Sequence, residues 1–250
     1  MMKKFLNYVM IFVLLMIITT SVNAQEIYYE NNNGVIFTKE EYDFFSKMYY
    51  DGYQASMTEE DMHMFEGYEL NAKNVESSIY VDKSFNPGTI QTKGNYHETQ
   101  AKILKISKLT GNMDPVISII AQWKYSPNVR SYDLIGAYFS GNINMASGIS
   151  SKVIYDGGSN YTSANITSSN GFGSVLLLPA NGRNIVVSTT FAVTGSGTVF
   201  GSYQHAKSVI SLNNAKTFSI SYSGLGNVFY FSNINIRAKY DAMQGVSIGV

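Results

Sequence analysis

The chain has 250 residues, with 18 basic and 18 acidic side chains and no cysteine. The absence of cysteine excludes disulfides, zinc thiolate sites, cysteine nucleophiles and lipid attachment through a lipobox cysteine. The even balance of charge argues against a nucleic-acid partner, because phosphate binding relies on clustered lysine and arginine.

The first 24 residues have the layout of a secretory signal peptide. A lysine pair precedes an apolar run over residues 5–18, broken only by Asn7, and small or short residues end the segment at Ala24. This apolar core is too short for a comfortable membrane span. We therefore predict cleavage before Gln25 and a secreted, extracellular protein without a transmembrane anchor after signal removal. Export without disulfides also favours a bacterial source.

Charge divides the remaining chain into two regions. Residues 25–110 hold 14 acidic and 8 basic side chains, whereas residues 111–250 hold 4 acidic and 8 basic side chains. The residue pattern changes near the same point. We predict an acidic, partly helical N-terminal segment over residues 25–110 and a β-sandwich domain over residues 111–250.

Two helix starts are visible in the acidic segment. Thr38-Lys-Glu-Glu41 matches a capping box, in which the threonine hydroxyl caps early amides and the glutamate reaches back. Its acids also suit the positive end of the helix dipole. An apolar stripe follows at spacings of three and four: Tyr42, Phe45, Met48 and Tyr49. Thr58-Glu-Glu-Asp61 predicts a second, shorter helix.

From about Ile103 the chain is typical of short strands separated by turn formers. Predicted strands include residues 117–125, 129–140, 153–155, 161–167, 174–178, 185–193, 198–205, 218–222, 228–231 and 234–240. Gly195-Ser-Gly197 is interpreted as a turn between two of them, and Asp156-Gly-Gly-Ser-Asn160 as a hairpin turn rather than a calcium loop. The pattern predicts a mainly β fold, an antiparallel β-sandwich or jelly roll preceded by a short helical N-terminal segment.

No motif after the signal peptide specifies a reaction, and we expect no metal or cofactor. The histidines His63, His97 and His205 are far apart, none in a ligand-spaced pair, and no Gly-x-Ser-x-Gly elbow is present. His205 ends a strand-like run. Either it is bonded to a neighbouring carbonyl group, or it has a metal-binding role or a catalytic role beside an acid and a hydroxyl.

Aromatic residues in the strand region allow two interpretations. They are Trp123, Tyr125, Tyr132, Tyr138, Tyr155, Tyr161, Tyr203, Tyr222, Tyr230 and Tyr240. On one exposed face they would form a platform for sugar rings or a peptide, because each ring is rigid and, in tyrosine and tryptophan, has a polar tip. Alternatively they fill the core and its edges. Trp123 is the expected core member, since apolar residues precede it.

Several stretches resemble small exported proteins of Bacillota. Asn33-Gly-Val-Ile-Phe-Thr-Lys-Glu-Glu-Tyr42 and Met57-Thr-Glu-Glu-Asp-Met62 resemble their leading segment. Trp123-Lys, Pro127-Asn-Val-Arg-Ser-Tyr-Asp133 and Gly201-Ser-Tyr-Gln-His-Ala206 resemble their sheet portion. The resemblance implies export and a two-part layout, and it transfers no catalytic residue. Arg130, Asp133, Tyr203 and His205 are our candidate binding residues. Arg130 and Asp133 have an alternative interpretation, in which they pair and fix a turn.

Three functions remain open from the sequence, which does not establish whether the protein is an enzyme. The first is a non-enzymatic extracellular binding module for a glycan, a cell-wall polymer or a protein. The second is a secreted membrane-active, toxin-like β protein in which residues 185–199 insert as hairpins. The third is an extracellular hydrolase with a site near His205, which requires an open pocket beside an acid and a hydroxyl.

Overall fold

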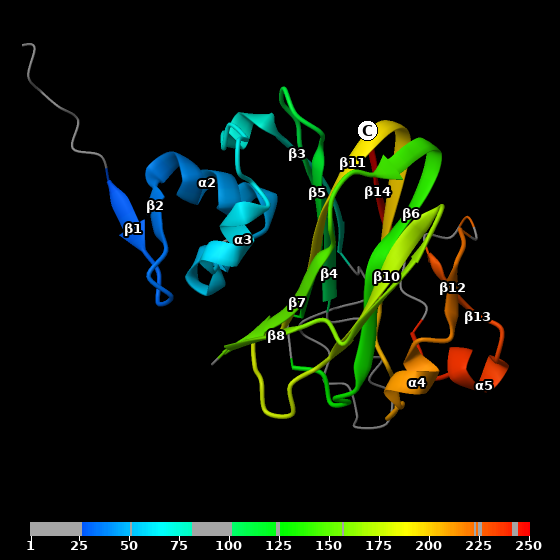
Figure 1. Cartoon of the computed structure of the whole chain (residues 1–250). Helices are drawn as coiled ribbons and strands as arrows, with labels where there is room; N and C mark the ends of the chain where they lie inside the picture. Colours follow the sequence, from blue (N-terminus) through cyan, green and yellow to red (C-terminus); the bar gives the residue numbers. More distant parts are fainter. Residues whose placement is uncertain are drawn as a thin grey trace, which may run out of the picture.

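The computed structural model describes residues 27–50, 52–81, 102–123, 126–156, 158–222, 224, 227–241 and 245–250. It confirms a mainly β, antiparallel fold with a few short helices (Figure 1). The predicted signal peptide lies outside the described residues, as do His97 and Tyr125. Within the described ranges, no helix has the length and apolar character needed to cross a membrane.

The elements in the acidic segment are β1 (Tyr28–Glu30), β2 (Ile36–Thr38), α2 (Lys39–Met48), η1 (Tyr53–Ser56), α3 (Glu59–His63), η2 (Ala72–Asn74), β3 (Val75–Val81) and β4 (Lys102–Leu109). The strands that follow are β5 (Val116–Trp123), β6 (Tyr132–Met145), β7 (Ser150–Tyr155), β8 (Gly158–Tyr161), β9 (Ala164–Ser168), β10 (Gly171–Leu177) and β11 (Val186–Gln204). The last elements are α4 (Leu212–Ala215), β12 (Phe218–Ile220), β13 (Phe229–Phe231), α5 (Ile234–Arg237) and β14 (Val246–Gly249).

A ten-stranded sheet organises the fold, and β11 is its central strand. The main order is β3-β4-β5-β11-β6-β10-β9, with β14 and β7 also paired to β11 and β8 paired to β7. Residues 186–192 of β11 pair with β5, and β7 lies along part of the same stretch. Residues 193–204 pair with β6, and β14 lies along part of that stretch. The hairpin predicted around Asp156 is confirmed, because β7 and β8 pair antiparallel.

The predicted turn at Gly195-Ser-Gly197 is wrong, because both glycines lie within the continuous strand β11. Gly195 has φ of 93°, and a Cβ there would lie 1.8 Å from the carbonyl oxygen of Asn142 on β6. A Cβ on Gly197 would lie 2.0 Å from the carbonyl oxygen of Ser140. The glycines therefore allow two backbones to approach closely while the strand continues.

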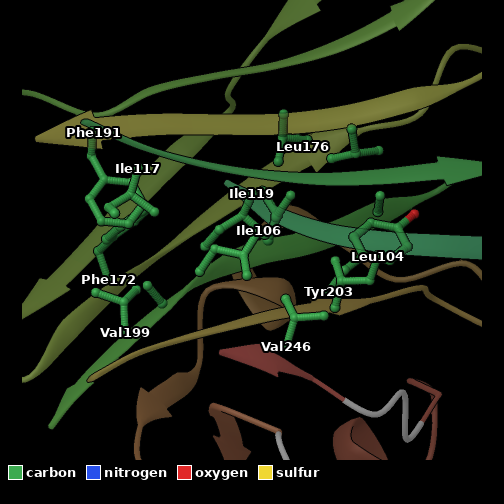
Figure 2. Packing of buried hydrophobic residues seen from close by; sticks show 14 of the residues in the cluster. Leu104, Ile106, Ile117, Ile119, Phe172, Leu176, Phe191, Val199, Tyr203 and Val246 are labelled. Carbon is green, nitrogen blue, oxygen red and sulfur yellow. The ribbon is translucent and has the colours of Figure 1, made fainter. Parts of the chain in front are cut away.

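The largest hydrophobic cluster takes side chains from β4 and β5, from β6 and β10, and from both parts of β11 (Figure 2). Phe172 and Phe191 make an edge-to-face contact in it, with ring centroids 4.8 Å apart. Trp123 belongs to this cluster and is 4% exposed, which confirms the prediction that it is a core residue. The two parts of β11 thus pack into one core.

A second cluster joins the acidic segment to the sheet. Helix α2 begins with the Thr38–Glu41 capping box and buries Phe44, Phe45 and Met48. These side chains share a cluster with residues of β4, β5, β7 and β11. Lys152 of β7 also forms a buried ion pair with Asp61 of α3, at 2.5 Å. The predicted boundary after residue 110 lies between β4 and β5, which are paired strands.

A third cluster covers part of the other side of the sheet. It contains Leu134 of β6 and Val175 of β10 together with residues of α4, β12, β13 and α5. The predicted strand over residues 234–240 is wrong, because α5 occupies its first four residues. The Asn233 side chain accepts hydrogen bonds from the amides of Asn235 and Ile236, which supplies a helix cap.

Candidate functional site

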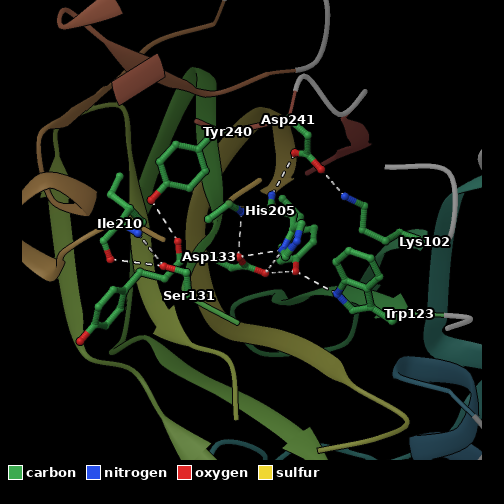
Figure 3. A network of polar contacts seen from close by, with 11 residues as sticks. Lys102, Trp123, Ser131, Asp133, His205, Ile210, Tyr240 and Asp241 are labelled. Atoms are coloured by element: carbon green, nitrogen blue, oxygen red, sulfur yellow. Dashed lines mark hydrogen bonds and ion pairs between the residues drawn. The ribbon is translucent and has the colours of Figure 1, made fainter. Parts of the chain in front are cut away.

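Three of the four candidate residues meet in one buried polar network (Figure 3). The Asp133 carboxylate lies 2.9 Å from Nδ1 of His205 and accepts a hydrogen bond from the Tyr203 hydroxyl. The amide of Ala206 donates to its other oxygen at 3.0 Å. Asp133, Tyr203 and His205 are each 0% exposed. The network therefore fixes the end of β11 against β6.

A buried ion pair extends the network. Lys102 of β4 contacts the Asp241 carboxylate, and their side chains are 0% and 1% exposed. Asp241 also accepts a hydrogen bond from the His205 amide at 2.9 Å. Burial raises the pKa of the Asp241 carboxyl, and the nearby Lys102 ammonium opposes that rise. The pair connects β4 to the segment that follows α5.

Trp123 is held by the same network. Its indole N–H donates to the Tyr203 hydroxyl at 3.0 Å, and its ring centroid lies 4.7 Å from that of His205 in an edge-to-face arrangement. The ammonium nitrogen of Lys102 lies 4.7 Å from the indole centroid, which is within cation–π range. Burial, reinforced by the Asp133 carboxylate, raises the pKa of the Tyr203 hydroxyl well above its ordinary value. It therefore stays protonated as a donor.

Arg130 lies apart from this arrangement. One of its guanidinium nitrogens, Nη2, donates to the carbonyl oxygen of Gly182 at 2.9 Å. Among the described residues, Asp133 is bonded by Tyr203, His205 and Ala206. The predicted Arg130–Asp133 pair stays a prediction. Arg130 ties the start of the β6 region to the loop before β11.

The network has the residue types of a hydrolytic site without the access that one needs. An acid, a hydroxyl and a histidine converge, as the hydrolase interpretation requires. All three side chains are completely buried, so a substrate has no path to them in this structure. The arrangement holds neighbouring elements together.

Trp123 also lines an open groove between the acidic segment and the strand ends of β5, β7 and β11. We call this hollow the Trp123 groove, and its volume is about 570 Å³. Its lining residues are Asn32, Asn33, Tyr50, Gly52, Ala55, Ser56, Thr58, Gln122, Trp123, Ile154, Tyr155, Asp156, Gly158, Ser159, Asn184 and Val186. This size is within the range of small-molecule sites, roughly 300–1,000 Å³.

The groove combines aromatic rings with hydrogen-bonding side chains. Its rings are Tyr50, Trp123 and Tyr155, and its amides come from Asn32, Asn33, Gln122 and Asn184. Asn184 donates to both oxygens of Asp156, each at 3.0 Å. Asp156 is the one acidic or basic side chain among the described lining residues. Burial raises the pKa of Tyr50 to about 12, so its hydroxyl remains a donor at neutral pH.

Asn184 is held in an unusual backbone conformation beside this carboxylate. Its φ is 49°, in the left-handed region that residues other than glycine rarely adopt. The backbone around it is fixed on both sides, since Asp156 donates its amide to the Arg183 carbonyl and Trp123 donates its amide to the Ile185 carbonyl, both at 3.0 Å. Conformations of this kind cluster at ligand-binding sites. The Asp156–Asn184 pair is therefore presented in one orientation.

A second hollow of about 580 Å³ lies over α2 and α3. Its acids include Glu40, Glu41, Glu59 and Glu66, which sit in or near the two helices. Glu41 is occupied by the Thr38 capping box. Nowhere in the described ranges do three or more His, Asp or Glu side chains gather in a way that would hold a metal ion.

Comparison with known protein families, with curated proteins and with solved structures finds no match for this chain. Evidence for the function must therefore come from the geometry of the site. Sequence reasoning selected Asp133, Tyr203 and His205, but it did not find the groove in front of them. The groove is assembled from separate stretches of chain, and of its three aromatic residues the sequence pattern indicates only Trp123 and Tyr155 as platform or core candidates.

Proposed function

We propose that the protein is a non-enzymatic extracellular binding module that holds an uncharged glycan in the Trp123 groove. Aromatic rings contribute rigid contact area, and amides with a fixed carboxylate offer donors and acceptors for sugar hydroxyls. The observation that carries the proposal is the double role of Trp123. It lines the groove, and Tyr203, His205 and Lys102 hold its ring in place behind it. A ring fixed in advance loses little entropy when a ligand binds.

The groove does not support glycoside hydrolysis. Glycosidases of the common type require two carboxylates that flank the bond to be cleaved. Asp156 has no acidic companion among the described lining residues. The stretch that a membrane-active protein would insert, residues 185–199, is largely strand β11: residues 186–190 are paired with β5 and β7, and residues 193–199 are paired with β6. Binding without chemistry is the function that this arrangement favours.

Two broader inferences accompany this proposal. The ten-stranded sheet is interpreted as a β-sandwich, because β11 pairs with two different sets of strands and one core collects side chains from both sets. Export of the mature chain, from residue 25 onward, rests on the signal-peptide layout and on the resemblance to exported proteins of Bacillota. An extracellular location would give the groove access to surface polysaccharides.

Fluorescence of Trp123 tests the proposal directly, because the chain has one tryptophan and it lines the groove. Titration with neutral cell-wall oligosaccharides should give a saturable change in its emission. Asp156→Ala should weaken binding about ten-fold or more, since hydrogen bonds to a charged group contribute about 1.5–3 kcal/mol.

Asp114→Ala provides the matched control, because Asp114 is also an exposed aspartate and lies outside the groove. Its affinity should equal that of the unmodified protein. A folded protein whose emission is unchanged by a broad panel of oligosaccharides would refute the proposal. Equal loss of affinity in both variants would show that the effect is general electrostatics rather than a contact in the groove.

A further inference from the structure

The outward positions of β6, β11 and β14 form a face without charged side chains. Register pairs Asn142 with Ser196 and Ser140 with Thr198, while Gly249 lies on the other side of Thr198. The full outward set is Tyr138, Ser140, Asn142, Asn144, Thr194, Ser196, Thr198, Phe200, Ser247 and Gly249. The intervening positions of β6 and β11 point into the core, as Phe139, Ile143, Val193 and Val199 show.

This face is the open continuation of a covered one. Toward the other end of β6 and β10, the third cluster lies over Leu134 and Val175. A Cβ on Gly173 would lie 2.5 Å from the Phe218 ring, which shows how closely β12 covers that end. In Figure 1, β12 and β13 lie beside β10 and β6, and the far ends of β6 and β11 extend past them. Ser140, Asn142, Ser196 and Ser247 are exposed there.

Three aromatic rings mark the border between the covered and open parts. Tyr222, in the segment after β12, stacks on Phe200 with centroids 4.0 Å apart, and on Tyr138 with centroids 5.8 Å apart. Tyr138 and Phe200 are themselves 6.4 Å apart. Tyr222 is 37% exposed, so the stack presents ring surface to solvent at the edge of the polar face. Mutual contact fixes the orientation of these rings.

From this juxtaposition we infer a second carbohydrate-binding surface that takes an extended, uncharged polysaccharide chain. Hydroxyl and amide groups spaced along neighbouring strands offer repeated donors and acceptors to a polymer of sugar hydroxyls. The aromatic stack offers apolar contact to the ring face of a sugar at one end. The outward side chains of these strands are uncharged, and the Lys108 ammonium group that donates to the Gly249 carbonyl at the edge is paired with Glu76, which favours a neutral occupant.

A second copy of this chain is a poorer occupant of the face. Stable interfaces between copies have an apolar core enriched in large side chains. The open part of this face carries serine, asparagine, threonine and glycine. None of its outward residues is valine, leucine, isoleucine or methionine. Hydrogen-bonding groups of this kind suit a hydrated polymer better than a dry protein contact.

Sedimentation with insoluble neutral polysaccharide tests the inference. The protein is mixed with cellulose particles or with chitin particles, and the fraction left in solution gives an apparent affinity. Ser140→Glu should lower the affinity at least about five-fold, because the carboxylate must lose water on a face whose own outward side chains include no cation. Tyr222→Ala should lower it by a similar factor through loss of the exposed ring. Ser77→Glu is the matched control, since Ser77 is an exposed serine of β3 outside the face.

These experiments can refute the proposal about the Trp123 groove and the inference about the polar face separately. Asp156→Ala should leave sedimentation with particles unchanged, and Ser140→Glu should leave the Trp123 fluorescence titration unchanged. Absence of binding to both particle types overturns the inference, whatever the groove does. Loss of particle binding in Asp156→Ala with full retention in Ser140→Glu also overturns it, since the groove would then account for the binding. A dimer that Ser140→Glu dissociates would identify the face as a contact between copies and would equally overturn it.

Discussion

Raising the pH to about 11 should remove much of the stability of this fold, because buried tyrosines cannot ionise inside it. Burial raises the pKa of Tyr49, Tyr53, Tyr203 and Tyr240 above the ordinary value near 10. In the unfolded chain the same hydroxyls ionise normally. The unfolded state therefore loses protons that the folded state keeps, so stability is full below pH 10 and falls as the pH rises further.

The expected loss follows from this proton balance. At pH 11, ionisation of one tyrosine with a pKa near 10 lowers the free energy of the unfolded state by about 1.4 kcal/mol. A tyrosine that stays protonated in the folded state gains nothing comparable. These four residues alone give roughly 6 kcal/mol, against a typical total stability of about 5–15 kcal/mol, and Tyr50, with its pKa raised to about 12, adds to the loss. We expect the protein to be marginally stable near pH 11 and unfolded about one pH unit higher.

Denaturant unfolding at pH 9, 10 and 11, with tyrosinate absorbance recorded alongside, measures this effect. Tyr49→Phe should reduce the loss between pH 9 and 11 by about 1.4 kcal/mol, because it removes one of the four groups. Tyr230→Phe should leave the loss unchanged, since Tyr230 is 49% exposed. Equal stability at pH 9 and 11 would refute the reasoning, as would normal titration of all tyrosines while the protein remains folded.

The same titration tests how the acidic segment and the sheet are coupled. Tyr49 and Tyr53 belong to the cluster between them, whereas Tyr203 belongs to the core of the sheet. A shared core predicts that these tyrosines ionise together in one cooperative transition. Earlier ionisation of Tyr49 and Tyr53 would show that the acidic segment detaches first.

Two further predictions concern the buried ion pair and the close strand approach. Lys102→Met alone should destabilise the fold by about 3–5 kcal/mol, because it leaves Asp241 buried without its cation. The double variant Lys102→Met with Asp241→Leu should lose much less free energy of unfolding than the sum of the two single variants. Denaturant unfolding of the four proteins gives the coupling free energy, and simple additivity would contradict a direct pair. Gly195→Ala should lose more than about 2 kcal/mol, because its Cβ meets the Asn142 carbonyl oxygen. Gly224→Ala is its control, with φ of 82° and no atom within 4 Å of the added Cβ, and equal losses in the two variants would show that strain in φ alone decides the result.

Features decided by neighbouring residues were predictable from the sequence. The Thr38–Glu41 capping box is an example, because both partners lie within one helical turn. The strand content followed from alternation and turn formers. The continuity of β11 did not, because Gly195 and Gly197 resemble a turn until the approach of β6 is known. The same holds for α5: the apolar pattern after Asn233 suggested a strand, but the Asn233 side chain caps a short helix there.

The site was predictable only in part, for a related reason. Asp133, Tyr203 and His205 were candidates because they lie in the stretches that resemble exported proteins of Bacillota, and they do converge. Lys102 was missed because lysine is almost never fully buried without a partner, and its partner lies 139 residues away. One signal was available: Lys102 shares a strand face with Leu104 and Ile106, both core residues. A lysine in phase with apolar positions indicates a buried cation.

The distance in sequence between Lys102 and Asp241 has a consequence for biogenesis. A ribosome must add 139 residues after the lysine before its counter-ion exists. During that interval the ammonium group requires water, so β4 and β5 cannot seal the interior around it. Acquisition of the native state is thereby deferred until residue 241 has been synthesised.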